Sequence, residues 1–159
     1  MTPALRDYQA IAHGVRTIAR DATVEERMRR TVDALWDSLH DRGVSWVGFY
    51  IDHPREPDDR RLTLGPCRDK PACSPIGLHG VCGQALLSRS VRIVRDVAEL
   101  GPNYIACDPR DRSEIVVPLL NGHGDCWAVL DMDSWEVEAF DQADASGLGT
   151  VLRAAGMVV

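Results

Sequence analysis

The sequence predicts an α+β protein, with a central antiparallel sheet of about five or six strands, helices on one face and an N-terminal helix pair. Three observations indicate this class. Apolar residues recur at helical spacing before residue 42, five strand-like segments follow between residues 44 and 132, and a last helical pattern follows them. The 159 residues suffice for a single domain over 1–159, helical at 1–42, with the sheet, loops and last helix at 43–159.

Two helices are expected first. Thr2 is the predicted cap of the first helix, with Pro3 at its first position. Thr23 and Glu26 have capping-box spacing for the second helix, and Gly43 follows its predicted end. The apolar stripes consist of Leu5, Tyr8, Ile11, Ala12, Val15 and Ile18 in the first helix, and of Val24, Met28, Val32, Leu35 and Leu39 in the second.

The sheet is expected from segments rich in β-branched and aromatic residues. The segment 121–125 carries turn residues between two of these strands and predicts a hairpin. A short helix is predicted over 81–88, and a last helix begins at Asp141. The predicted strands cover residues 44–51, 61–64, 91–94, 114–120 and 126–132.

Charge and hydropathy exclude several partners. The net charge of −6 gives no field that would attract nucleic-acid phosphates. No apolar stretch approaches the roughly 20 residues of a membrane span, and the first residues lack the pattern of a signal peptide. We therefore expect a cytoplasmic protein with neither a nucleic-acid nor a membrane partner.

The five cysteines are the strongest chemical signal. Thiols in a cytoplasmic protein start out reduced, and disulfides that form there are usually catalytic or redox-sensing. Cys73, Cys82 and Cys107 precede two clusters of acids, which indicates redox chemistry on a small cationic substrate. Cys126 lies in an apolar strand and fits a buried core residue, whereas Cys67 fits either interpretation.

Reduction of a sulfoxide requires such a set of groups: a cysteine thiolate that attacks sulfur, an acid that protonates the departing oxygen, and a second thiol that resolves the sulfenic acid. Arg110 and Arg112 follow Cys107 and would favour a thiolate there. Cys82 begins a predicted helix, whose dipole would do the same. Cys73, in a proline-bounded loop, suits a resolving thiol.

Carboxylates and aromatic residues complete the candidate site. Asp131 and Asp133 share one face of a strand, and Glu114 opens the neighbouring strand, so the three acids would hold an ammonium group. A solvated strand end is the alternative. Trp46 and Tyr50 also share a strand face and would form the wall of a pocket for a methyl-sulfur group, unless they are core residues.

A zinc site is a further alternative. Cys73, His79 and Cys82 lie close together in the sequence. No pair has the C-x-x-C spacing of structural zinc sites, so we expect no metal.

Eight segments, in order over about residues 20 to 155, resemble the free methionine-(R)-sulfoxide reductases, which are single GAF-domain enzymes. The resemblance implies a GAF fold and the reduction of free methionine (R)-sulfoxide, with no cofactor and with thioredoxin as external reductant. The segments are WVGFY at 46–50, LGP at 64–66, KPAC at 70–73, GVCG at 80–83, DV at 96–97, IACD at 105–108, SEIVVP at 113–118 and VLDMDS at 129–134.

By the same resemblance, Cys107 is the nucleophile, Cys73 the main resolving thiol and Cys82 the third member of the set. The resemblance also implies that the substrate is bound by acids and aromatic residues. GAF domains often dimerise through terminal helices, which points to residues 3 to 42 as a homodimer contact. The helix-start argument favours Cys82 as nucleophile, so that choice stays open. The implied substrate-binding residues are Trp46, Tyr50, Glu114, Asp131 and Asp133.

Several positions depart from the family pattern. Cys67 stands where the family usually has Phe, Asp69 where it has Gly, and Tyr104 where it often has His. The loop from Cys73 to Cys82 is one residue shorter than usual, which puts the reach from Cys73 to Cys107 in question. The rival functions are a non-catalytic GAF domain that binds a small molecule or senses redox state, and an interaction domain whose cysteines only fill the core.

Overall fold

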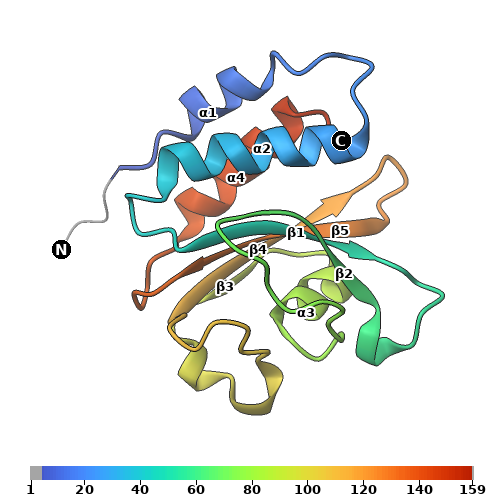
Figure 1. Ribbon diagram of the computed structural model, residues 1–159, viewed down its shortest axis with the longest axis vertical. Coiled ribbons are helices and arrows are strands. Elements are labelled where there is room, and N and C mark those ends of the chain that lie inside the picture. Colours follow the sequence, from blue (N-terminus) through green and yellow to red (C-terminus); the bar gives the residue numbers. More distant parts are fainter. Residues whose placement is uncertain (1–4, 159) are drawn as a thin grey trace.

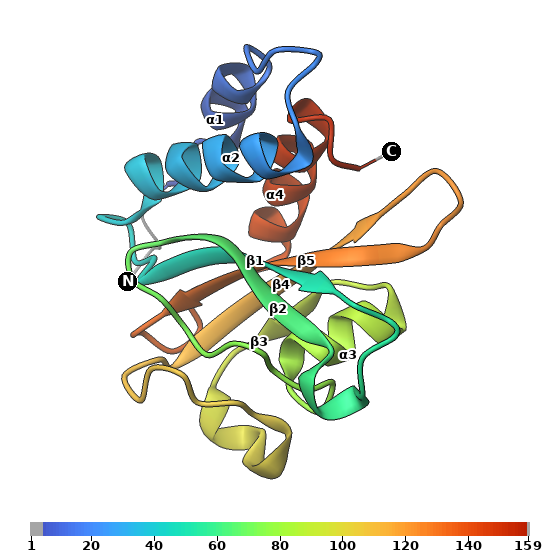
Figure 2. The same ribbon diagram turned by 45° about the vertical axis from the view of Figure 1, so that its right-hand side comes forward.

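A computed structural model describes residues 5–158 as one antiparallel sheet between two unequal layers (Figure 1). The helices α2 and α4 pack on one face with α1 packed against them, and α3 lies on the other face (Figure 2). The five strands have the order β2-β1-β5-β4-β3. The elements are α1 (Tyr8–Val15), α2 (Val24–Leu39), β1 (Trp46–Asp52), β2 (Leu62–Arg68), α3 (Val81–Ser88), β3 (Arg92–Val94), β4 (Ser113–Leu120), β5 (Cys126–Ser134) and α4 (Gln142–Ala154).

The sequence predicted this order of elements, and the α+β fold class is confirmed, with the difference that the short helix α3 lies on the opposite face of the sheet from the other helices. The helix α3 has the predicted bounds, and Thr23 caps α2 by accepting the Glu26 backbone N–H at 3.1 Å. Asp141 caps α4 in a complete capping box with Asp144. Within residues 5–158, no helix is both long and apolar enough to cross a membrane.

The start of α1 was predicted too early. The helix begins at Tyr8, and Asp7 caps it by accepting the Ala10 N–H at 3.0 Å. The predicted cap Thr2 and the adjacent Pro3 lie outside the described residues. The predicted apolar stripe began at Leu5 and therefore extended the helix past this cap.

A buried network joins α1 to α4. The Arg6 guanidinium donates to Asp144 Oδ1 at 2.9 Å, and the Tyr8 hydroxyl donates to the same oxygen at 2.6 Å. The Tyr8 ring lies against Gly147, where a Cβ atom would overlap it. The α1–α4 contact therefore depends on the Asp144 carboxylate, which Arg6 and Tyr8 share, and on the absence of a side chain at Gly147.

The strand β2 is longer than predicted, because it continues through Gly65 and Pro66 to Arg68. Proline is tolerated there because β2 is an edge strand, whose outward N–H groups need no partner. The extension pairs Cys67 with Gly48 of β1.

Strand register divides the side chains between two cores. Glu114 pairs with Asp133, and Trp46 pairs with the same residue from the other side of β5. Because successive side chains in a strand point to opposite faces, alternate residues of β1, β4 and β5 pack under α1, α2 and α4, while the remaining ones face α3. The predicted site residues of these strands are therefore all on the α3 face.

Candidate active site

A small cavity of about 40 Å³ lies on the α3 face of the sheet. It brings together seven of the eight predicted site residues, and the eighth, Cys73, is covalently bonded to one of them. Three central strands, the first turn of α3 and the loop before β4 form its wall. The lining residues are Trp46, Tyr50, Ala72, Ile76, Val81, Cys82, Tyr104, Ile105, Cys107, Asp111, Glu114, Asp131 and Asp133.

Cys73 and Cys107 form a disulfide at the cavity, with their Cα atoms 5.5 Å apart. The shorter loop between Cys73 and Cys82 therefore does not prevent Cys73 from reaching Cys107. The pairing also removes Cys73 from the alternative zinc set with His79 and Cys82.

Trp46 and Tyr50 of β1 hold the loop that carries Cys73. Trp46 Nε1 donates to the Lys70 carbonyl at 2.8 Å, and the Tyr50 hydroxyl donates to the Cys73 carbonyl at 2.8 Å. The two ring centroids are 6.2 Å apart. These residues thus line the cavity, as predicted for a pocket wall, and also belong to the core on this face.

The absence of a side chain at Gly48 leaves the space that the Trp46 indole occupies. A Cβ atom at Gly48 would overlap the indole ring and the Cβ of Cys67. Only glycine leaves this space free, so the residue between the two aromatic side chains shapes the pocket wall without a side chain of its own.

The three predicted acids lie beside one another. Glu114 and Asp131 are buried, and Glu114 Oε2 and Asp131 Oδ1 find no hydrogen-bond partner within residues 5–158. Burial raises the pKa of Glu114 to about 7. Burial and the neighbouring carboxylates raise the pKa values of Asp131 and Asp133 well above their usual range.

These shifts have one physical meaning. Three close carboxyl groups cannot all ionise in a water-poor site, so they retain protons near neutral pH. A cation in the cavity would stabilise the ionised forms and satisfy the unpartnered oxygens. The arrangement suits a cationic ligand, and its protonated form supplies a proton donor.

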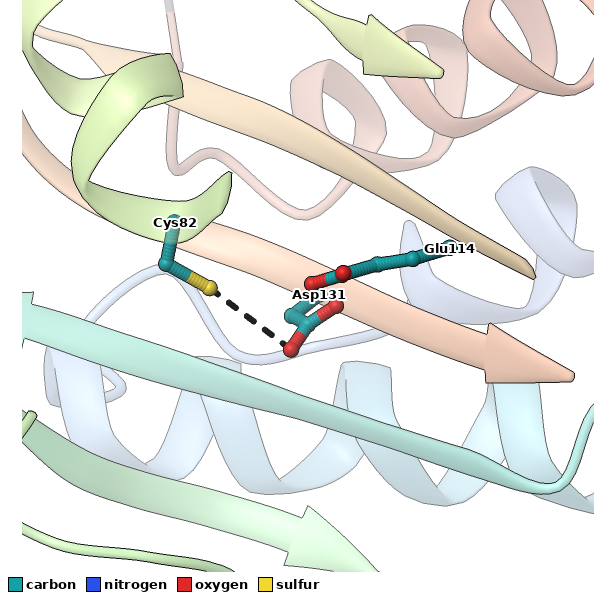
Figure 3. Close-up of side chains that lie close together, drawn as sticks. All are labelled: Cys82, Glu114 and Asp131. Carbon is teal, nitrogen blue, oxygen red and sulfur yellow. Dashed lines mark hydrogen bonds between the residues drawn. The ribbon is translucent and has the colours of Figure 1, made fainter. Parts of the chain in front are cut away.

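Cys82 is a buried thiol in the first turn of α3 (Figure 3). Its Sγ donates to Asp131 Oδ2 at 3.6 Å. Burial and the charges of Asp131 and Glu114 raise the pKa of this thiol, so the prediction of a thiolate from the helix start was wrong. Desolvation and nearby negative charge outweigh the helix dipole here.

The predicted influence of two arginines on Cys107 is also corrected. Arg110 donates twice to the Asp108 carboxylate, at 3.0 Å each, and lies over the Trp135 ring. Arg112 lies 4.0 Å from Asp96. Both guanidinium groups pair with carboxylates, which offsets the charge expected to favour a thiolate.

One acid of the cavity, Asp111, was not among the predicted site residues. Asp111 is buried, lines the cavity and accepts a hydrogen bond from Ser45 Oγ at 3.3 Å. Burial raises the pKa of Asp111 to about 6. The only sequence signal for Asp111 was its position three residues before Glu114. An acid in an expected loop is normally interpreted as solvent-exposed.

The two remaining cysteines lie outside the cavity lining. Cys67 is partly exposed on β2, and its Sγ donates to the Lys70 carbonyl at 3.7 Å. Cys126 is partly buried on β5 and donates to the Ala128 carbonyl at 3.3 Å. Both positions fit packing residues of the sheet.

The fold and the matching family model define the class. The GAF domain model matches residues 21–159, so the chain belongs to the GAF domain family. Within that class, the chain belongs to the free methionine-R-sulfoxide reductase family, as the relatives show.

The relatives cover most of the chain. The Escherichia coli free methionine-R-sulfoxide reductase is 34% identical over 145 residues, which is 90% of this chain and 78% of that protein. The Saccharomyces cerevisiae free methionine-R-sulfoxide reductase is 40% identical over 102 residues, covering 64% of this chain and 55% of the yeast protein. The Neisseria meningitidis free methionine-R-sulfoxide reductase, solved in complex with its substrate, superposes with a TM-score of 0.82 at 32% identity, over 96% of this chain and 90% of that one.

Proposed function

We propose that this protein reduces free L-methionine (R)-S-oxide to L-methionine by thiol chemistry, with no bound cofactor. The observation that carries the proposal is the Cys73–Cys107 disulfide, because Cys107 lines the same cavity as the three acids. A redox-active thiol pair and a cation-binding site thus occupy one space. Membership of the reductase family supports the same reaction.

The acids bind the α-ammonium group of the substrate. Carboxyl groups among Glu114, Asp131 and Asp133 ionise when this cation enters, because its charge offsets part of their mutual repulsion, and a carboxyl group that keeps its proton serves as the acid in the chemical step. The methyl-sulfur end then packs against Trp46 and Tyr50. A methionine within a peptide has no α-ammonium group, which restricts the enzyme to the free amino acid.

Cys107 performs the chemical step. Its sulfur attacks the sulfoxide sulfur while a carboxylic acid of the cavity protonates the oxygen. The hydroxyl group passes to Cys107 as a sulfenic acid, and methionine leaves as the sulfide. The substrate is reduced by two electrons and Cys107 is oxidised by two.

Cys73 resolves the intermediate. Its thiol attacks the Cys107 sulfenic acid, the disulfide forms and water leaves. A thioredoxin dithiol then reduces the disulfide and becomes oxidised itself. Cys82, whose thiol donates to Asp131, orients that carboxylate.

A turnover assay tests this function. The (R) and (S) epimers of free methionine sulfoxide are supplied with thioredoxin or dithiothreitol, and methionine is quantified. We expect turnover of the (R) epimer only, its loss in Cys107→Ser, and survival of Cys73→Ser with dithiothreitol but not with thioredoxin. Binding without turnover would instead support the non-catalytic GAF alternative, and equal activity in Cys107→Ser would refute the nucleophile.

The assembly and location of the protein are part of the proposal. The chain acts as a single domain in the cytoplasm, and residues 3 to 42 mediate a homodimer. Sedimentation of the purified protein measures the oligomeric state, and a monomer at all concentrations would refute the dimer.

A further inference from the structure

Cys82, Glu114 and Asp131 place three metal-ligand atoms in a small volume (Figure 3). One atom from each residue lies within 4.8 Å of the other two. A tetrahedral zinc ion, with Zn–O of about 2.1 Å and Zn–S of about 2.3 Å, requires two oxygen ligands about 3.4 Å apart and a sulfur and an oxygen about 3.6 Å apart. The distance of 3.6 Å from Cys82 Sγ to Asp131 Oδ2 meets this requirement, and the other two pairs of ligand atoms, at most 4.8 Å apart, need to approach by no more than about 1.4 Å.

The unpartnered oxygens point independently to a ligand. Glu114 and Asp131 are only 5% and 6% exposed, and one oxygen of each finds no hydrogen-bond partner within residues 5–158. Buried carboxylate oxygens are rarely left unbonded, because their desolvation is costly. The cavity beside them, at about 40 Å³, has room for a water as the fourth ligand.

The thiol determines which kind of cation fits best. An ammonium group gains little from a thiol that donates toward its carboxylates, whereas a soft metal ion gains a strong ligand once the thiol proton is displaced. Two carboxylates without sulfur would favour Mg²⁺ or Ca²⁺. The mixed sulfur and oxygen set favours Zn²⁺.

We propose that Cys82, Glu114 and Asp131 bind one zinc-class divalent ion, and that this ion excludes the substrate's ammonium group from the same oxygens. Zn²⁺ would then inhibit the enzyme. The exclusion rests on the proposed function, but the metal site does not. The site also differs from the alternative considered from sequence, because Cys82 is the only thiol it uses.

The disulfide form provides a clean test of the metal site. Its Cys73 and Cys107 are bonded to each other, so neither thiol competes for metal, and no reductant is needed. Co²⁺ is titrated into this form, and thiolate-to-cobalt absorption is recorded. We expect one equivalent to bind, with Zn²⁺ displacing it, the absorption lost in Cys82→Ser and the affinity at least tenfold weaker in Glu114→Gln.

Cys126→Ser is the matched control, because it removes a thiol from β5, the strand that carries Asp131, at a position outside the cavity lining. It should bind Co²⁺ as the wild type does. No absorption in the wild type, or absorption that survives in Cys82→Ser, would overturn the metal site. Asp131→Asn, expected to weaken binding at least tenfold, serves as the decisive variant if Cys82→Ser does not fold.

Exclusion of the substrate is measured separately, without turnover. The Cys73→Ser/Cys107→Ser double variant retains the three proposed metal ligands and lacks the redox pair. We expect free methionine sulfoxide to raise the apparent Co²⁺ dissociation constant in proportion to its concentration. Simultaneous binding of both would overturn the exclusion, whereas a variant that binds Co²⁺ but no sulfoxide would refute the proposed function and leave the metal site standing.

Discussion

Glu114→Gln should make the protein more stable at alkaline pH. Glu114 is buried, and its pKa rises from an ordinary 4.5 to about 7 in the folded protein. The folded state therefore retains a proton that the unfolded state has lost. Glu114 therefore makes its full contribution to the free energy of unfolding below pH 4.5, and this contribution is lost as the pH rises to about 7.

The shift gives the size of the effect. Each unit of pKa difference corresponds to about 1.4 kcal/mol, so ionised Glu114 costs on the order of 3 kcal/mol at pH 8. Gln has a similar shape and carries no charge. We expect Glu114→Gln to be about 1 to 3 kcal/mol more stable than the wild type at pH 8, with the difference vanishing or reversing near pH 4.5.

Urea unfolding of the disulfide form, at several pH values from 4.5 to 8, measures this difference. Glu136→Gln is the control, because it makes the same substitution at an exposed position. A Glu114→Gln variant that is less stable by the same amount at every pH would refute the electrostatic account of the site.

Three further results are expected. In Gly48→Ala, the new Cβ would displace the Trp46 indole, so KM for the free sulfoxide should rise at least tenfold, with a stability loss of about 1 to 3 kcal/mol. Gly147→Ala should cost a similar stability in urea, because its Cβ would overlap the Tyr8 ring, but it should leave KM unchanged. Calorimetry should show tighter binding of free methionine sulfoxide as the pH rises from 5 to 8, because the acids must ionise to accept the ammonium group, and no binding of the N-acetylated compound.

Local patterns were sufficient for most of the fold. The hairpin of β4 and β5 follows from two apolar segments on either side of a turn-rich segment, and α3 has the bounds predicted from its sequence. The start of α1 does have a local signal, the Asp7 cap, but the apolar stripe that includes Leu5 extended the predicted helix past it. The length of β2 depends on its edge position, which only the assembled sheet defines.

For the site as well, local sequence predicted some features, and others depend on the assembled fold. Strand periodicity placed Asp131 and Asp133 on one face, and the neighbouring strand added Glu114, as the structure shows. The raised pKa of the Cys82 thiol could not be predicted from its helix position, because it follows from burial and from the nearby acids of β4 and β5. Asp111 was missed because nothing in its local sequence distinguishes a buried loop acid from a solvated one.

The most direct test of the account is the site of oxidation after a single turnover. Reduced Cys73→Ser protein is mixed with one equivalent of free methionine (R)-sulfoxide, trapped with dimedone and analysed by mass spectrometry. The account predicts one methionine released per protein and the sulfenic-acid adduct on Cys107. An adduct on Cys82, or methionine released with Cys107 still unmodified, would contradict it.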